Sequence, residues 1–133
     1  MDKQYHPLEI EEKWSKIWSE RVISNKDSDI SFAQVIPPPN VTGTLHMGHS
    51  FQYAIMDFYT RYNHMSGKDA HWQVGADHAG IATQMVVENN LAKKDITRLE
   101  LGREKFLDEV WSWKDYSEQK ITSQIKRLGC SVD

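Results

Sequence analysis

The chain of 133 residues is long enough for one domain with a single hydrophobic core, and its five Trp, five Tyr and four Phe residues exclude a disordered chain. The net charge of -3 gives no electrostatic argument for nucleic-acid binding, although a local basic patch stays open, and the single cysteine excludes an internal disulfide and a cysteine-rich zinc site. Because no apolar run approaches membrane-span length and the N-terminal segment does not resemble a signal peptide, we expect a cytoplasmic protein without a membrane partner.

The first predicted element is a helix that begins at Pro7, where the missing N–H of proline costs little, and runs to about residue 21. Its apolar residues recur at helical spacing, which indicates a helix docked on the domain (Ile10, Trp14, Ile17, Trp18). Residues 24–29 are a polar loop. A short apolar run from Phe32 to Ile36 then predicts a buried strand, which ends at Pro37-Pro38-Pro39 because three prolines cannot continue a sheet ladder.

A second helix is predicted from about Leu45 to about Met65, after turn residues at 40–43. An apolar stripe marks this helix as amphipathic, and Gly67 is placed to end it in a left-handed conformation. The stripe consists of Leu45, Phe51, Ile55, Phe58, Tyr62 and Met65.

Two histidines stand in the first turn of this second helix. His46 and His49 are three residues apart and share a helix face, where unpaired N–H groups and the positive end of the helix dipole suit an anion. Gly48 between them has no side chain, which would let another backbone or a nucleotide approach closely. Gly43 and Gly48 are spaced as in a Walker loop, but His49-Ser50 stands where that loop needs Lys-Ser or Lys-Thr, so this is not a standard P-loop.

Residues 70–74 predict a second short strand, and a helix follows from about Ile81 to Lys93. The order strand, helix, strand, helix predicts a parallel sheet with right-handed crossovers. Ligands of such sheets bind beyond the carboxyl ends of the strands. The loop that contains Asn40 and the loop that contains Asp77 both fall at that edge, which is the strongest physical indication of a site.

The last third is predicted to be helical, so the α/β fold is helix-rich at both ends. Thr97 and Glu100 have the spacing of a capping box, and Gly129 is a stop residue. Trp111 and Trp113 resemble a base-stacking platform, but packing in the core or at an interface is the favoured interpretation. The apolar residues at helical spacing are Phe106, Val110, Trp113, Ile121, Ile125 and Leu128.

The segment PPPNVTGTLHMGH, Pro37 to His49, resembles the signature of class I aminoacyl-tRNA synthetases, whose His-x-Gly-His motif binds ATP. With three prolines and Asn-Val-Thr-Gly it is similar to the valine-specific members. A second segment, WQVGADHAGIATQMVVE from Trp72 to Glu88, matches the same members, whereas the isoleucine and leucine relatives differ there. Weaker similarity covers the rest of the chain, with Ala76 and Glu118-Gln119 as small departures.

The resemblance implies a Rossmann-type parallel sheet, with residues 1–133 as the N-terminal portion, about half, of the catalytic domain. The family's Lys-Met-Ser-Lys-Ser loop, editing domain and anticodon-binding helical domain are absent from this sequence, and we expect the chain to be cut rather than finished. The implied reaction is ATP-dependent activation of valine to valyl-adenylate, followed by transfer to tRNA(Val), which would be bound mostly by parts outside this chain. Mg²⁺ would arrive with ATP, because carboxylate ligands for a metal are not evident.

The resemblance also implies roles for individual residues. His46 and His49 would be catalytic, as hydrogen-bond donors to the ATP phosphates, although a metal pair and ordinary surface histidines are the alternatives. Asp77 would pair with the ammonium group of the amino acid, with polar contacts from the Pro38 carbonyl and Asn40; its alternative is a turn or N-cap aspartate. The ATP-binding set is Thr42, Gly43, His46, Gly48 and His49.

Two other classes of function remain. A binding or structural module could keep this fold without turnover. A nucleotidyltransferase other than a synthetase is disfavoured by the second matching segment.

Overall fold

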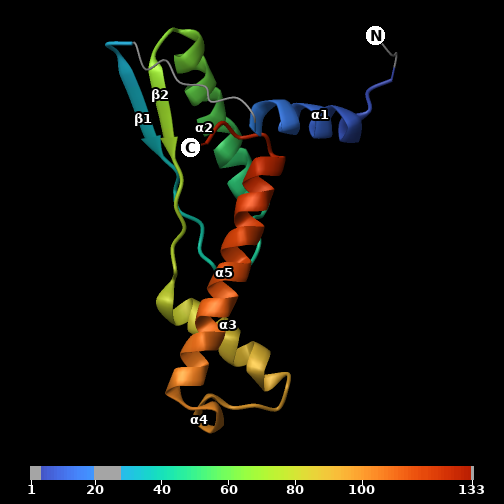
Figure 1. Ribbon diagram of the computed structural model, residues 1–133, viewed down its shortest axis with the longest axis vertical. Helices are drawn as coiled ribbons and strands as arrows, with labels where there is room; N and C mark the ends of the chain where they lie inside the picture. Colours follow the sequence, from blue (N-terminus) through green and yellow to red (C-terminus); the bar gives the residue numbers. More distant parts are fainter. Residues whose placement is uncertain (1–3, 20–27, 133) are drawn as a thin grey trace.

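The computed structural model describes residues 4–19 and 28–132 (Figure 1). The two strands and α2 lie at one end of an elongated molecule, α3 and α4 lie at the other end, and α5 connects the two. The elements in chain order are α1 (Pro7–Ser19), β1 (Ser31–Val35), α2 (Met47–Met65), β2 (Asp69–Gln73), α3 (Gly80–Ala92), α4 (Arg98–Leu101) and α5 (Arg103–Arg127).

The two strands form a parallel sheet, which confirms the predicted strand–helix–strand unit. Ser31 lies opposite Asp69, and Val35 lies opposite Gln73. The helix α2 connects the strands and covers one face of the sheet, and Tyr53 from this helix is completely buried against Trp72 of β2. The two rings meet edge to face, with centroids 6.4 Å apart. The same core cluster contains Ile36, Ile121 and Ile125, so α5 completes this core.

The second core cluster joins the helices at the other end of the molecule. Val87 and Leu91 of α3 pack against Phe106 of α5. Thr97 caps the short helix α4 and exchanges hydrogen bonds with Glu100, which confirms the predicted capping box. None of the helices in the described part of the chain combines the length and the apolar character that crossing a membrane requires.

Most predicted boundaries agree with the structure to within one or two residues. The first helix begins at Pro7, and its predicted end at residue 21 lies outside the described residues, as does most of the predicted loop at 24–29. Gly67 and Gly129 have φ angles of 81° and 74°, which confirms them as left-handed helix stops. The helix α2 begins two residues later than expected, since His46 is its N-cap and not a residue of its first turn.

The docking of α1 is less extensive than its apolar spacing suggests. Ile10 and Trp14 are exposed, and α1 projects from the rest of the molecule in Figure 1. The contact lies at the end of the helix, where the guanidinium of Arg61 sits 4.6 Å from the centre of the Trp18 ring. A Cβ atom on Gly129 would come within 2.7 Å of the same ring. The docked helix is therefore confirmed only at its C-terminal end.

The apolar stripe of α2 does not pack into the core of this chain. Its members within the helix are exposed (Phe51, Ile55, Phe58, Tyr62, Met65). The buried face contains Tyr53, Thr60 and Asn63 instead. Gln34 of β1 contacts this face, because its Nε2 donates to the Met56 carbonyl at 2.7 Å and to the Thr60 hydroxyl. The face of α2 that meets the sheet therefore combines these polar contacts with the packing of Tyr53 on Trp72, which hydropathy alone does not indicate.

Candidate functional site

The loops that follow the two strands are joined by main-chain hydrogen bonds. The first loop (residues 36–46) leaves β1, and the second loop (residues 74–79) leaves β2. Asn40 and Asp77 form a parallel bridge: the Asp77 N–H donates to the Pro39 carbonyl, and the Val41 N–H donates to the Asp77 carbonyl, both at 3.0 Å. The strand pairing thus continues past the sheet, which confirms that both loops lie at its carboxyl edge (Figure 1).

The two histidines cap the start of α2 through their own rings. Nδ1 of His46 accepts a hydrogen bond from the Gly48 N–H at 3.1 Å. In return, Nδ1 of His49 accepts from the main-chain N–H of His46 at 3.2 Å. The ring centroids lie 4.0 Å apart, so the two rings lie side by side at the start of the helix, although His46 is its N-cap. Two of the N–H groups expected to face an anion are therefore occupied by these rings.

This arrangement assigns the proton of each ring. A ring nitrogen that accepts a hydrogen bond carries no proton, so this hydrogen-bond pattern leaves Nε2 of each ring as the nitrogen that can donate. Partial burial, and then the charge that His46 would carry, lower the pKa of His49 from its ordinary value of 6.5. The Nε2 atoms of the pair are therefore the nitrogens left to donate, which suits the oxygens of a phosphate.

Gly48 has a reason for its missing side chain within the chain itself, besides the close approach of a ligand that the sequence suggests. A Cβ atom at this position would lie 2.9 Å from Cε1 and 3.0 Å from Nδ1 of His46. Glycine is thus needed because the His46 ring folds back over the first turn of α2. By contrast, a Cβ atom on Gly43 would meet no atom within 4 Å.

Asp77 organises the second loop as well as carrying a charge. One carboxylate oxygen accepts a hydrogen bond from the Ala79 N–H at 2.8 Å. Ala79 is the N-cap of α3 and has a left-handed conformation with φ of 48°, which is uncommon for a residue other than glycine. Asp77 therefore has the turn role that was considered as its alternative, whereas the N-cap of α3 is Ala79. The side chain is exposed at the loop surface, so its charge remains accessible to a ligand.

The remaining predicted residues lie along the first loop. Pro38 and Asn40 are exposed, whereas Thr42 is half-buried. The carbonyl of Gly43 accepts a hydrogen bond from the Ser117 hydroxyl of α5 at 3.1 Å. The structure thus joins Asn40 with Asp77, and His46 with His49, on neighbouring parts of one loop system.

Three polar contacts from α5 to the first loop were not identified from the sequence. Trp113, Ser117 and Gln124 each hydrogen-bond to the main chain of this loop. Their spacing places them on one face of a helix, which is the available signal in the sequence. Nothing in the sequence, however, specifies which distant backbone such a face would meet.

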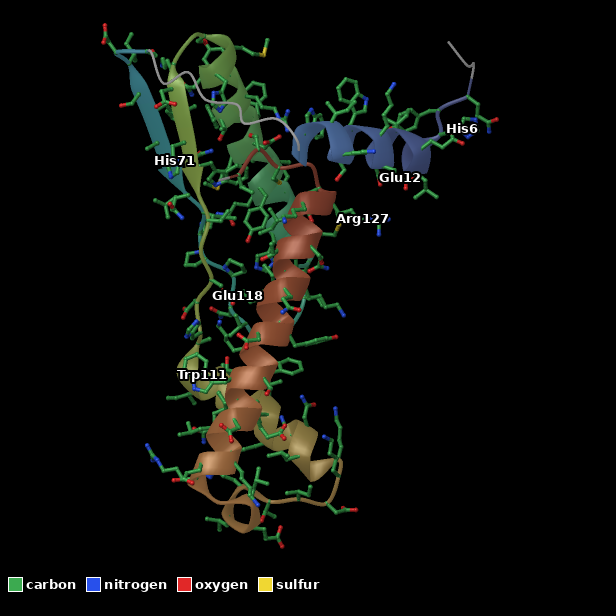
Figure 2. All side chains as sticks on the ribbon, viewed as in Figure 1. His6, Glu12, His71, Trp111, Glu118 and Arg127 are labelled. Atoms are coloured by element: carbon green, nitrogen blue, oxygen red, sulfur yellow. The ribbon has the colours of Figure 1, made fainter. Side chains whose placement is uncertain are left out.

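The two tryptophans considered as a stacking platform have different roles. Trp113 is half-buried beside the second core cluster, which confirms the packing interpretation for this residue. Trp111 is exposed and meets His78 of the second loop edge to face, with ring centroids 6.0 Å apart. Figure 2 shows Trp111 on α5 beside the start of α3. In the described residues, no group of three or more His, Cys, Asp or Glu side chains is arranged to hold a metal ion.

Comparisons with known proteins agree over nearly the whole chain. The family model for class I tRNA synthetases (I, L, M and V) matches residues 9–133. The chain is 58% identical to the valine–tRNA ligase of Acinetobacter baylyi over 97% of its residues, and 52% and 53% identical to those of Francisella tularensis and Neisseria meningitidis serogroup B over all of them. It spans 13%, 15% and 14% of the lengths of these relatives.

Proposed function

The chain belongs to the class I tRNA synthetases of the I, L, M and V group, and we propose that it is the N-terminal portion of the catalytic domain of a valine–tRNA ligase. In the proposed reaction, a carboxylate oxygen of valine attacks the α-phosphate of ATP. The bond to the bridging oxygen breaks, so that valyl-adenylate forms and pyrophosphate leaves. The valyl group then passes to tRNA(Val), which binds mostly to parts outside this chain.

The observation that carries the proposal is the pair of histidine rings at the carboxyl edge of the sheet, each with its Nδ1 bonded to a main-chain N–H and its Nε2 left to face a ligand. No protein nucleophile is needed, because the substrate carboxylate attacks directly. Catalysis then depends on positioning and on stabilising the charge that grows on the phosphates. His46 and His49 serve as donors to the ATP phosphates, and the hydrogen bonds from the main-chain N–H groups of Gly48 and His46 to their rings hold the rings in position before ATP arrives. Thr42, Gly43 and Gly48 complete the ATP-binding loop.

The valine part of the proposal rests on the bridge between the two loops. Asp77 pairs with the ammonium group of the amino acid, because its carboxylate is exposed and is held by a turn at the sheet edge. The Pro38 carbonyl and Asn40 add polar contacts from the paired loop. This arrangement orients the valine carboxylate toward the nucleotide bound near the histidines.

The proposed partners are valine, ATP and tRNA(Val). Mg²⁺ enters with ATP as the counter-ion of its phosphates and not as a resident metal of this chain. We assign the protein to the cytoplasm, because tRNA charging requires the tRNA and ATP of that compartment.

A second candidate function is binding of ATP and valine without turnover. It is favoured by the small share of the relatives that this chain spans, between 13% and 15% of their lengths. Residues needed for adenylate formation could then be supplied by other parts of the relatives.

Valine-dependent exchange of pyrophosphate into ATP separates the two candidates. The experiment uses the 133-residue chain and a variant that carries His46→Ala and His49→Ala, together with equilibrium titration of ATP and of valine. Exchange that requires both valine and the histidines supports a working adenylation site. Binding of both ligands without exchange supports the second candidate. A folded chain that binds neither ligand would refute both.

A further inference from the structure

Three side chains on one face of α5 form hydrogen bonds with the main chain of the first loop. Nε1 of Trp113 donates to the Val41 carbonyl at 2.9 Å. The hydroxyl of Ser117 donates to the carbonyl of Gly43 at 3.1 Å, and Oε1 of Gln124 accepts from the N–H of Leu45 at 3.0 Å. We call Trp113, Ser117 and Gln124 the α5 clamp.

The clamp matches the loop in its spacing and in the main-chain groups that it bonds. Its partners are every second residue of the loop, 41, 43 and 45, in a stretch that begins with a turn at residues 41 and 42. Two members donate to carbonyls and the third accepts from an N–H, so both kinds of main-chain group are held. The last contact falls on Leu45, directly before the N-cap histidine of α2.

The clamp is anchored in both hydrophobic cores. Ile121 and Ile125, which lie beside the clamp on α5, belong to the core cluster of the sheet. Trp113 packs beside the cluster formed by α3 and α5. Ser117 is only 1% exposed, so its hydroxyl is shielded from bulk water and its hydrogen bond to the Gly43 carbonyl is not easily exchanged for one to water. The loop is therefore held by a rigid element and not by its own turns alone.

We propose that the α5 clamp is a set of positioning residues that sets the direction in which His46 and His49 present their Nε2–H donors. The proposal rests on the proposed function, because the donors matter only if a phosphate binds there. The clamp acts through the loop and does not touch the nucleotide. Losing one contact lets the loop before His46 relax, which misdirects the rings and weakens contacts to the phosphates.

The chain offers matched variants for a test. Gln124→Met removes the acceptor at similar length, whereas Gln124→Glu keeps an acceptor oxygen. Ser117→Ala removes a clamp contact, and Ser123→Ala is its control on the same helix, because the Ser123 hydroxyl donates only within α5, to the Lys120 carbonyl. Because Gln124 is only half-buried, we expect its variants to fold. They can therefore test the clamp even if Ser117→Ala fails to fold.

Two readouts are measured on each variant: the affinity for ATP, and the ring-nitrogen NMR shifts of His46 and His49. We expect Gln124→Met and Ser117→Ala each to weaken ATP binding about fivefold and to move the ring shifts away from the Nε2–H form. Gln124→Glu and Ser123→Ala should behave as the parent chain. The ring shifts report the local geometry of the histidines, which a general loss of stability in a folded chain does not alter.

The outcomes separate this inference from the proposed function. Unchanged ring shifts in both clamp variants overturn the positioning role, whether or not the parent chain binds ATP. If the parent binds no ATP but the clamp variants still shift the rings, the clamp stands and the proposed function fails. If ATP affinity is equal in clamp and control variants while the parent binds ATP, the clamp has no role in the site.

Discussion

The main-chain N–H of His46 donates a hydrogen bond to the ring of His49, with 3.2 Å between the two nitrogens. The ring of His46 accepts in turn from the Gly48 N–H, so the pair that is proposed to bind phosphate also caps α2. Both bonds need an unprotonated Nδ1. Protonation of the His49 ring therefore disrupts the cap and the site together.

The first prediction is a loss of stability in mild acid. The pKa of His49 is lowered from 6.5 by partial burial and then by His46. A group whose pKa is lower in the folded state contributes stability above its unfolded pKa, and this contribution is lost as the pH falls through the folded pKa. The free energy of unfolding, measured by urea titration, should therefore decrease as the pH is lowered below 6.5.

His49→Gln is the control for this pH effect. Glutamine at the third helical position can accept from the N-cap N–H but does not titrate in this range. The difference in slope between the parent chain and the variant isolates His49 from the other histidines. Equal slopes below pH 6.5 would contradict the proposed cap.

The second prediction concerns the two glycines near the starts of α2 and α3. Alanine in a helix is favoured over glycine by about 1 kcal/mol, and a Cβ atom on Gly80 would meet no atom within 4 Å. We expect Gly80→Ala to raise the free energy of unfolding by up to about 1 kcal/mol. Gly48→Ala should lack this gain and should weaken ATP binding about tenfold, because the new Cβ displaces the His46 ring.

Thermal melts and ATP titrations of both glycine variants check this prediction. A Gly48→Ala chain that binds ATP as tightly as Gly80→Ala would show that the position of the His46 ring is unimportant for the nucleotide. A stabilising Gly48→Ala with displaced ring signals in NMR would contradict only the stability part.

Local patterns were sufficient for the elements of the fold but not for the contacts between them. Helix stops, the capping box and the order of strands follow from neighbouring residues, so Gly67, Gly129 and the Thr97–Glu100 pair are where the sequence predicts. The buried face of α2 meets Gln34, which bonds to Thr60 across 26 positions. A single polar contact between distant residues leaves no periodic pattern in the sequence. The apolar stripe of α2 lies on the exposed face of the helix and not on the buried one.

The candidate site shows the same division. The histidine pair and the two loops are contiguous motifs, and they were identified from the sequence. The α5 clamp joins residues as far apart as Leu45 and Gln124, 79 positions in the chain. Such a contact depends on how α5 lies against the loop, which only the packed core determines. The role of Gly48 was likewise visible only once the His46 ring had a position.

The third prediction is an unreactive Cys130. Burial, followed by the negative charge of Asp57, raises the pKa of this thiol from 9.0 to about 11. Asp57 is fixed beside it, because one carboxylate oxygen accepts from both the main-chain N–H and the hydroxyl of Ser131, at 2.7 and 2.6 Å. At pH 8 we expect iodoacetamide to alkylate the native thiol at least about tenfold more slowly than the thiol of the urea-unfolded chain.

The same raised pKa has a consequence for stability. A thiol whose pKa is higher in the folded state contributes stability below its unfolded pKa, and this contribution is lost as the pH rises through the folded pKa. The free energy of unfolding should fall between pH 9 and pH 11. Cys130→Ser is the control, since its hydroxyl does not titrate there. Equal alkylation rates in the native and unfolded chains would contradict the burial of the thiol.

The last prediction separates the two roles of Asp77. Its carboxylate holds the second loop through the Ala79 N–H and is proposed to bind the ammonium group of valine. Asp77→Asn keeps an oxygen that can accept from the Ala79 N–H but removes the charge. Asp77→Ala removes both. We therefore expect both variants to weaken valine binding by about 1.5–3 kcal/mol, the usual contribution of a hydrogen bond to a charged group.

Stability distinguishes the two variants of Asp77. Ala79 is held at a φ of 48°, so loss of the turn bond in Asp77→Ala should lower the free energy of unfolding by about 1 kcal/mol, whereas Asp77→Asn should leave it nearly unchanged. Valine titration and urea unfolding of both variants give the comparison. If Asp77→Asn binds valine as tightly as the parent chain, the carboxylate serves the turn alone, and the ammonium group must be bound by another residue.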